Sequence, residues 1–275
     1  MFSLIISVIT AVIAYIVFSP LAAHISNWWW AILWTLLVFA ATMIGINFAV
    51  KKKVTLLMNE LQRMMLEGRD TIQKKVAEFQ RRPVGDPKTA MAQLEKMQRQ
   101  QIETALEFTK KLEPFASWTP LLGRQINTTR MQFNYQLKQF KEVDALMPKC
   151  IILDPLSGAM KIARQYKTEV PLAEMEKTFK QISSRLRYNQ STLLYSLMAW
   201  IYVKNNDEAN AYKTLVKACE TNENDTLKKN RDRLANGKMR EFSNANFGDE
   251  WYALFLEEPK MRVERRIPRA DGRPF

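Results

Sequence analysis

The first fifty residues carry no charged side chain, and this feature limits what the chain can fold into. All 41 Lys and Arg residues and all 28 Asp and Glu residues lie after position 50. Two apolar runs occupy the uncharged part, at residues 2–18 and 28–50. At about 1.5 Å per helical residue the second run spans roughly 35 Å, enough to cross the hydrocarbon core of a bilayer with some tilt. Residues 1–50 are therefore predicted to form a transmembrane helical hairpin, connected at residues 19–27.

Three basic residues, Lys51, Lys52 and Lys53, end the second run and predict its orientation. Basic residues are retained on the cytoplasmic side, so we expect a two-pass integral membrane protein with both termini in the cytoplasm, for example in a bacterial inner membrane. Anionic lipid head groups are expected to contact these lysines. The alternative of a cleaved signal peptide at residues 1–23 is disfavoured, because no basic residue precedes the first apolar run.

Three consecutive tryptophans, Trp28, Trp29 and Trp30, begin the second run. An indole ring can lie at the acyl boundary while its N–H reaches the head groups, so we expect an anchor at the outer membrane interface. Small residues also recur every four positions, as Ser3, Ser7 and Ala11 in the first run and as Ala41, Gly45 and Ala49 in the second. Such stripes allow two helices to approach closely, although small-residue-rich spans also produce them by chance.

Two amphipathic helices are predicted in residues 51–113, which we interpret as a basic stalk. Apolar residues follow a three-four rhythm on both sides of a break at residues 83–87. Asp86 before Pro87 predicts the start of the second helix. Because the connection is short, the two helices are expected to pair as an antiparallel hairpin. Gln98 and Gln101 in the second helix and Gly68 and Lys75 in the first interrupt the apolar seam, so a dedicated coiled-coil dimer is not predicted.

A different spacing pattern occupies residues 192–225. The first group has an aromatic, a large, a small and an aromatic side chain, at Tyr195, Met198, Ala199 and Tyr202. Nine residues later a second group has a small, a large and a small side chain, at Ala211, Leu215 and Ala218. The pattern resembles the tetratricopeptide repeat, whose helices carry W-x2-L-G-x2-Y and A-x3-F-x2-A. Ala199 stands where the family has glycine, and Glu223 where proline is common. A generic helical bundle is the alternative, because small and large residues also alternate in ordinary helix packing.

The resemblance implies an all-α solenoid over residues 114–258, closed by capping helices at residues 226–236 and 249–257. It also implies a concave groove that receives a partner segment. In this frame the groove residues are Arg164, Lys167, Trp200 and Lys204, a basic and aromatic set suited to an acidic peptide. Residues 259–275 form a basic extended tail, in which Arg262, Arg265 and Arg266 are expected to contribute further partner contacts.

The inventory of reactive side chains argues against catalysis. Cys150 and Cys219 match no metal-ligand spacing and are expected to be buried, reduced thiols. The single histidine, His24, lies in the apolar part of the chain. We find no nucleophile–base pair, no phosphate-binding glycine loop and no metal motif. The sequence therefore predicts no catalytic residues, no metal, no cofactor and no small-molecule ligand, and the protein is not expected to be an enzyme.

The preferred interpretation is a membrane-anchored adaptor or scaffold that binds protein partners at the cytoplasmic membrane face. One alternative is a structural subunit of a larger membrane complex, assembled through its transmembrane hairpin. Another is a ribosome- or nucleic-acid-associated membrane protein, suggested by the net charge of +13. That charge is concentrated in residues 51–112 and 259–275, so the folded domain has no predicted basic face for nucleic acid.

Overall fold

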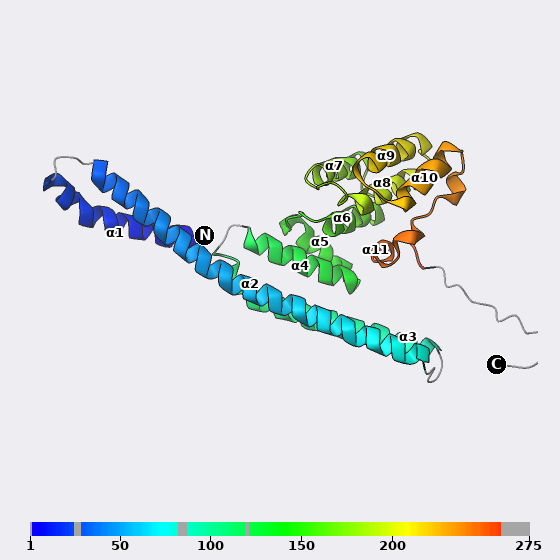
Figure 1. Cartoon of the computed structure of the whole chain (residues 1–275), viewed down its shortest axis with the longest axis horizontal. Coiled ribbons are helices and arrows are strands. Elements are labelled where there is room, and N and C mark those ends of the chain that lie inside the picture. The colour runs from blue at the N-terminus through cyan, green and yellow to red at the C-terminus, as the bar shows by residue number, and fades with distance from the viewer. Residues whose placement is uncertain (1, 25–28, 82–86, 119–120, 260–275) are drawn as a thin grey trace, which may run out of the picture. The chain divides into compact units, whose positions relative to one another are not determined.

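The chain folds entirely into helices over the part that the structure describes. This computed structural model describes residues 2–24, 29–81, 87–118 and 121–259 (Figure 1). The α-helices are α1 (Phe2–His24), α2 (Trp29–Arg81), α3 (Pro87–Phe108), α4 (Leu122–Gln136), α5 (Phe140–Leu146), α6 (Pro155–Lys167), α7 (Leu172–Ser183), α8 (Thr192–Lys204), α9 (Glu208–Thr221), α10 (Asp225–Ala235) and α11 (Asp249–Tyr252). Short 3₁₀ helices are η1 (Thr109–Phe115), η2 (Met147–Lys149), η3 (Met239–Glu241) and η4 (Ala245–Phe247). These described residues include no strand, which confirms the prediction of an all-α protein.

The helices form two compact units, Met1–Ile152 and Leu153–Phe275. The division falls inside the range 114–258 for which helical repeats were predicted, so α4 and α5 belong to the first unit. Their packing explains this grouping: Phe133 of α4 is buried in one cluster with Leu61 of α2 and Ile102 of α3. The remaining helices, from α6 onward, pack among themselves.

Both N-terminal helices are long and apolar enough to cross a membrane, judged by length and composition. The apolar stretches are Phe2–Pro20 in α1 and the first part of α2. The two helices pack against each other, and the hydroxyls of Thr10 and Thr42 lie 3.3 Å apart between them. Ser3 and Ser7 are buried, whereas most large apolar side chains of both helices are exposed. Such a surface suits a surrounding that is itself apolar.

The helix that contains the second apolar run does not end at the lysines. Helix α2 continues without interruption for 53 residues, from Trp29 to Arg81. The predicted boundary between residues 50 and 51 is therefore a change of surface chemistry inside one helix. No proline and no glycine occurs between positions 46 and 67, so the backbone has no reason to break there.

Helix α3 lies along the C-terminal half of α2 (Figure 1). Two of the four residues that interrupt the predicted seam, Gln101 and Gly68, match each other across it. The side-chain amide of Gln101 donates to the backbone carbonyl of Met65 at 2.8 Å. A Cβ at Gly68 would overlap that amide, so the glycine provides the space that the glutamine fills.

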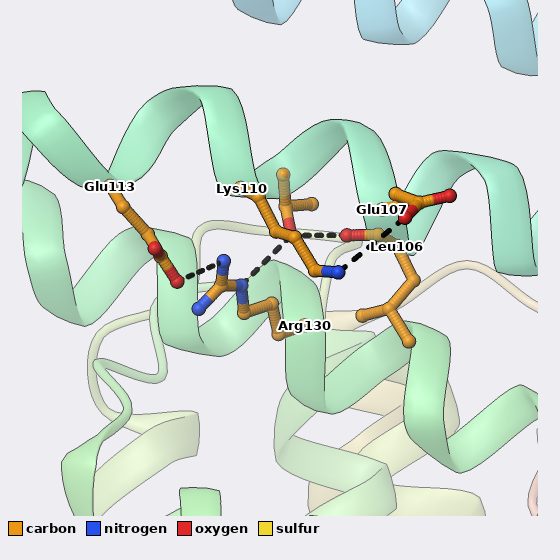
Figure 2. A network of polar contacts seen from close by, with 6 residues as sticks. Leu106, Glu107, Lys110, Glu113 and Arg130 are labelled. Atoms are coloured by element: carbon orange, nitrogen blue, oxygen red, sulfur yellow. Dashed lines mark hydrogen bonds and ion pairs between the residues drawn. The ribbon is translucent and has the colours of Figure 1, made fainter.

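A polar network joins η1 to α4 (Figure 2). Arg130 Nε donates to the buried hydroxyl of Thr109 at 2.8 Å, and Arg130 Nη2 lies 2.7 Å from Glu113 Oε1. The Thr109 hydroxyl in turn donates to the carbonyl of Leu106 at 2.6 Å. One half-buried guanidinium thus fixes the turn that follows α3.

In the second unit, α8 is buried on nearly all sides, and α9 packs along it. Local signals define the helix starts: Asp154 caps α6 before Pro155, and Asp207 and Asn224 cap α9 and α10 with side-chain hydrogen bonds. The capping helix predicted at residues 249–257 is wrong in length. α11 ends at Tyr252, because Phe255 adopts a φ of 52° and the chain turns there.

Candidate functional site

The structure does not assemble the predicted groove residues into one exposed site. Arg164 and Lys167 lie on α6, and Trp200 and Lys204 lie on α8. Lys167 and Lys204 are exposed and Arg164 is half-buried, but Trp200 is only 4% exposed. A partner bound at the surface could not use the Trp200 ring, so its expected role as a groove residue is corrected to a packing role.

The surroundings of Trp200 explain its burial. Its ring meets Tyr166 edge-on at 5.2 Å and Trp251 at 5.7 Å between centroids. Glu257, which follows α11, accepts both indole N–H groups, from Trp200 at 2.8 Å and from Trp251 at 2.9 Å. The Lys204 ammonium lies 5.1 Å from the Trp200 ring centroid, a cation–π distance. The chain's own C-terminal segment therefore covers this face of α8.

Lys167 lies instead in a shallow groove of about 570 Å³ with Tyr166, Glu169 and Met175. Neither Arg164 nor Lys204 lines it. The acidic Glu169 at the same opening offsets the lysine, which weakens the case for an acidic ligand here.

A different groove in the same unit has a stronger positive character. It lies between α7, α8 and α9 and encloses about 530 Å³. Lys180 comes from α7, and Lys213 and Lys217 come from successive turns of α9. We call these three residues and the space between them the lysine groove. Within the described part of the chain, no carboxylate lies in ion-pair distance of any of the three lysines.

Aromatic side chains form the floor of the lysine groove. Phe179 and Tyr195 meet edge to face at 5.0 Å, and the Tyr202 hydroxyl donates to Glu176 Oε1 at 2.7 Å. Burial, and next the hydrogen bond to Glu176, raise the pKa of Tyr202 well above its ordinary value. Burial likewise raises the pKa of Tyr195. Both phenols are therefore neutral at physiological pH, and the charge of the groove comes from the lysines and the single carboxylate of Glu176.

This arrangement can bind anions. Lys213 and Lys217 are four residues apart on one helix, where like charges repel, and Lys180 adds a third positive charge from the neighbouring helix. A bound carboxylate relieves that repulsion. The hydroxyls of Ser183, Ser184 and Thr214 also line the groove and add neutral hydrogen-bonding partners.

Sequence reasoning missed the lysine groove because it followed only the first helix of each proposed repeat. Lys180 and Lys213 belong to second helices in that frame. The available signal was the pair Lys213 and Lys217, which flank the core residue Leu215 on α9.

A larger open groove of about 1000 Å³ lies in the first unit, beside the Arg130 network of Figure 2. Its lining includes Lys110, Arg130 and Lys141 together with the apolar Phe140 and Leu146. Arg130 and Lys110 are already engaged, with Glu113 at 2.7 Å and Glu107 at 3.5 Å. This groove therefore offers less uncompensated charge than the lysine groove.

The predicted membrane-interface residues that the structure describes all lie on α2. Trp29 and Trp30 are exposed in the first turn of α2, and Lys51, Lys52 and Lys53 are exposed near its middle. Trp28 lies outside the described residues, as do Arg262, Arg265 and Arg266 of the tail.

No metal or thiol chemistry is evident in the described part of the chain. Among these residues, no group of three or more His, Cys, Asp and Glu side chains could hold a metal ion. Cys150 and Cys219 are half-buried thiols, less buried than predicted. Burial raises the pKa of the Cys219 thiol, which disfavours the reactive thiolate.

Comparison with known proteins adds no relative: no family model, no curated protein and no solved structure matches this chain.

Proposed function

We propose that this protein is a two-pass, membrane-anchored helical adaptor whose lysine groove binds an acidic segment of a partner protein at the cytoplasmic membrane face. The observation that carries the proposal is the set of three lysines, Lys180, Lys213 and Lys217, around an aromatic floor, with no carboxylate partner among the described residues. Charge-assisted hydrogen bonds to carboxylates are the strong contacts such a surface offers. The proposal includes no catalytic activity.

The resemblance to tetratricopeptide repeats supports a binding role. In the helix pair α8 and α9, the small signature residues Ala199, Ala211 and Ala218 and the large residue Leu215 are completely buried. These positions bring two helices close together, as the repeat requires. In our proposal, α6 to α9 form a short repeat array that presents the partner surface.

The membrane anchor in this proposal is the pair formed by α1 and the first part of α2. Their apolar surfaces, together with the lysines that follow, give two spans with both termini in the cytoplasm. Reporter fusions after residue 23 and after residue 275 test the orientation. They should report opposite compartments, and reports from the same side would refute the two-span arrangement.

Partner binding is tested by two charge reversals of equal size. The Lys213→Glu, Lys217→Glu variant changes the lysine groove, and the Arg164→Glu, Lys167→Glu variant changes the site predicted from the sequence. Each lost charge-assisted contact costs about 1.5–3 kcal/mol, so the first variant should lose at least about tenfold in affinity. The probe is a short labelled peptide alternating glutamate with leucine, titrated into the full chain in detergent. An unchanged affinity of the lysine-groove variant would refute the lysine groove as the binding site. A loss of affinity only in the Arg164→Glu, Lys167→Glu variant would show that the peptide binds at α6.

A second candidate function rests on the exposed face of α2. Ala41, Gly45 and Ala49 remain exposed, and no neighbouring atom of the described residues lies within 4 Å of the position of a Cβ at Gly45. A flat stripe of this kind permits close packing of another transmembrane helix, as in a subunit of a larger complex. Pull-down from solubilised membranes separates the two functions. One variant has its transmembrane hairpin replaced by an unrelated one. If this variant loses its partners while the lysine-groove variant retains them, the protein is a subunit assembled through its transmembrane spans.

A further inference from the structure

The start of α1 is joined to a turn that lies more than a hundred residues later in the sequence. The backbone N–H of Phe2 donates to the carbonyl of Ser117 at 3.1 Å. The hydroxyl of Ser3 donates to the carbonyl of Trp118 at 2.7 Å. The rings of Phe2 and Trp118 also meet, with centroids 5.9 Å apart. The turn that follows η1 thus supplies acceptors to the first turn of α1, whose N–H groups have no partner within the helix.

The length of α1 fixes the depth of this contact once α1 is placed across a membrane. The apolar stretch Phe2–Pro20 has 19 residues. At about 1.5 Å per residue it spans roughly 28 Å, nearly the whole hydrocarbon core of about 30 Å. A span of this length places Phe2 at the edge of the hydrocarbon. Ser117 and Trp118, bonded to Phe2 and Ser3, must lie at the same depth.

A second contact places the same region at the same level on α2. Leu112 of η1 and Leu122 and Ile126 of α4 are buried together, and Val54 of α2 and Phe115 pack against them. Val54 directly follows Lys51, Lys52 and Lys53, which mark the cytoplasmic edge of the second span. Figure 1 shows the N-terminal end of α1 beside α2.

The side chains that remain accessible here suit a membrane interface. Trp118 is half-buried, and an indole prefers the boundary between acyl chains and head groups. Leu121 is 53% exposed, which is unfavourable in water but suitable at the acyl boundary. Arg124 is exposed in the first turn of α4, the turn whose Leu122 is buried in the cluster that Val54 packs against.

From these contacts we infer that Trp118 and Leu121 insert into the cytoplasmic leaflet of an anionic membrane, and that Arg124 joins Lys51, Lys52 and Lys53 in binding lipid phosphates. The inference rests on the membrane anchoring proposed above. It adds a third membrane contact, formed by the stalk-to-α4 junction, which fixes the base of α4 against the bilayer. The charge complementarity is with anionic lipid, for which basic residues near the surface have a direct preference.

Nitroxide accessibility measures this insertion in the full chain. Single labels are placed by Leu121→Cys, Met91→Cys or Leu36→Cys in a background carrying Cys150→Ser and Cys219→Ser, and the protein is reconstituted into phosphatidylcholine vesicles with and without phosphatidylglycerol. Met91 is the matched control, because it is 57% exposed near the start of α3, and α3 begins after the end of α2 that is far from its apolar part. Leu36 is 67% exposed in the apolar part of α2 and serves as the membrane reference.

The measured quantity is the ratio of accessibility to oxygen over accessibility to a water-soluble nickel complex. This ratio should be severalfold higher for the label at Leu121 than for the label at Met91. Phosphatidylglycerol should raise the ratio at Leu121 further. A label at Leu121 that behaves like Met91 while Leu36 reports lipid would overturn the inference and leave the anchoring intact. A label at Leu36 that behaves like Met91 would overturn the membrane anchoring itself. A preference at Leu121 that is unaffected by phosphatidylglycerol would overturn the role of anionic phosphates.

Discussion

The indole N–H of Trp200 donates to Oε1 of Glu257 at 2.8 Å, across 57 residues of sequence. The other carboxylate oxygen of Glu257 accepts from Trp251 at 2.9 Å. One carboxylate therefore satisfies two buried indoles and attaches the C-terminal segment to α8. The contact also removes Trp200 from the surface on which a partner was expected.

Glu257→Gln should destabilise this attachment. A neutral amide offers one acceptor oxygen, so one of the two indole N–H groups loses its partner, at a cost of about 1–3 kcal/mol. Near-ultraviolet circular dichroism during thermal unfolding of the full chain in detergent follows the tryptophan cluster directly. Glu258→Gln is the control, because Glu258 is the exposed neighbour. Equal unfolding midpoints for the two variants would contradict the double acceptor role.

Ala199→Leu should overfill the contact between α8 and its neighbours. Ala199 has no exposed surface, and forcing additional carbons into a packed contact costs about 1–3 kcal/mol. Ala209→Leu makes the same substitution at an exposed position of α9 and should be nearly neutral. Urea unfolding of both proteins measures the difference. A comparable loss at Ala209, or none at Ala199, would show that the close helix contact is misassigned.

Tyr202→Phe should change the alkaline stability profile. Because burial and Glu176 raise the pKa of Tyr202 in the folded protein, the folded state holds the phenolic proton more tightly than the unfolded state. The resulting stabilisation is complete below the ordinary tyrosine pKa of about 10 and is lost as the pH rises toward the folded pKa.

At pH 7, Tyr202→Phe removes the hydrogen bond to Glu176 and should lower the free energy of unfolding by about 1 kcal/mol. Above about pH 10 the gap between the two proteins should narrow, because only the wild type loses this contribution. Urea midpoints measured from neutral to alkaline pH test the trend. A gap that widens with pH would contradict the stated direction of the pKa change.

Arg130→Met should loosen the junction between η1 and α4. The substitution keeps most of the aliphatic length but removes the donors to Thr109 and Glu113 (Figure 2). We expect a loss of about 1–2 kcal/mol, since Glu113 is more than half exposed and the ion pair is partly screened. Gln125→Met, at an exposed position of the same helix, is the control. Hydrogen exchange at residues 109–115 should increase only in the Arg130 variant.

The sequence by itself determined the helical class, the two apolar segments and the position of most helices. Those features depend on composition, on periodicity and on caps such as Asp207 and Asn224, which act within a few residues of the chain. The burial of Ala199, Ala211 and Ala218 likewise follows from spacing along two adjacent helices.

Only the tertiary structure decided which exposed charges face one another and which apolar faces are covered. The lysine groove combines α7 with α9 on either side of α8, and the partner of Gly68 is Gln101 on another helix. Trp200 was predicted to line a surface groove, but Glu257 and Trp251, about fifty residues later in the sequence, cover it. Local sequence patterns do not encode such pairings, because they depend on how separate helices pack in space.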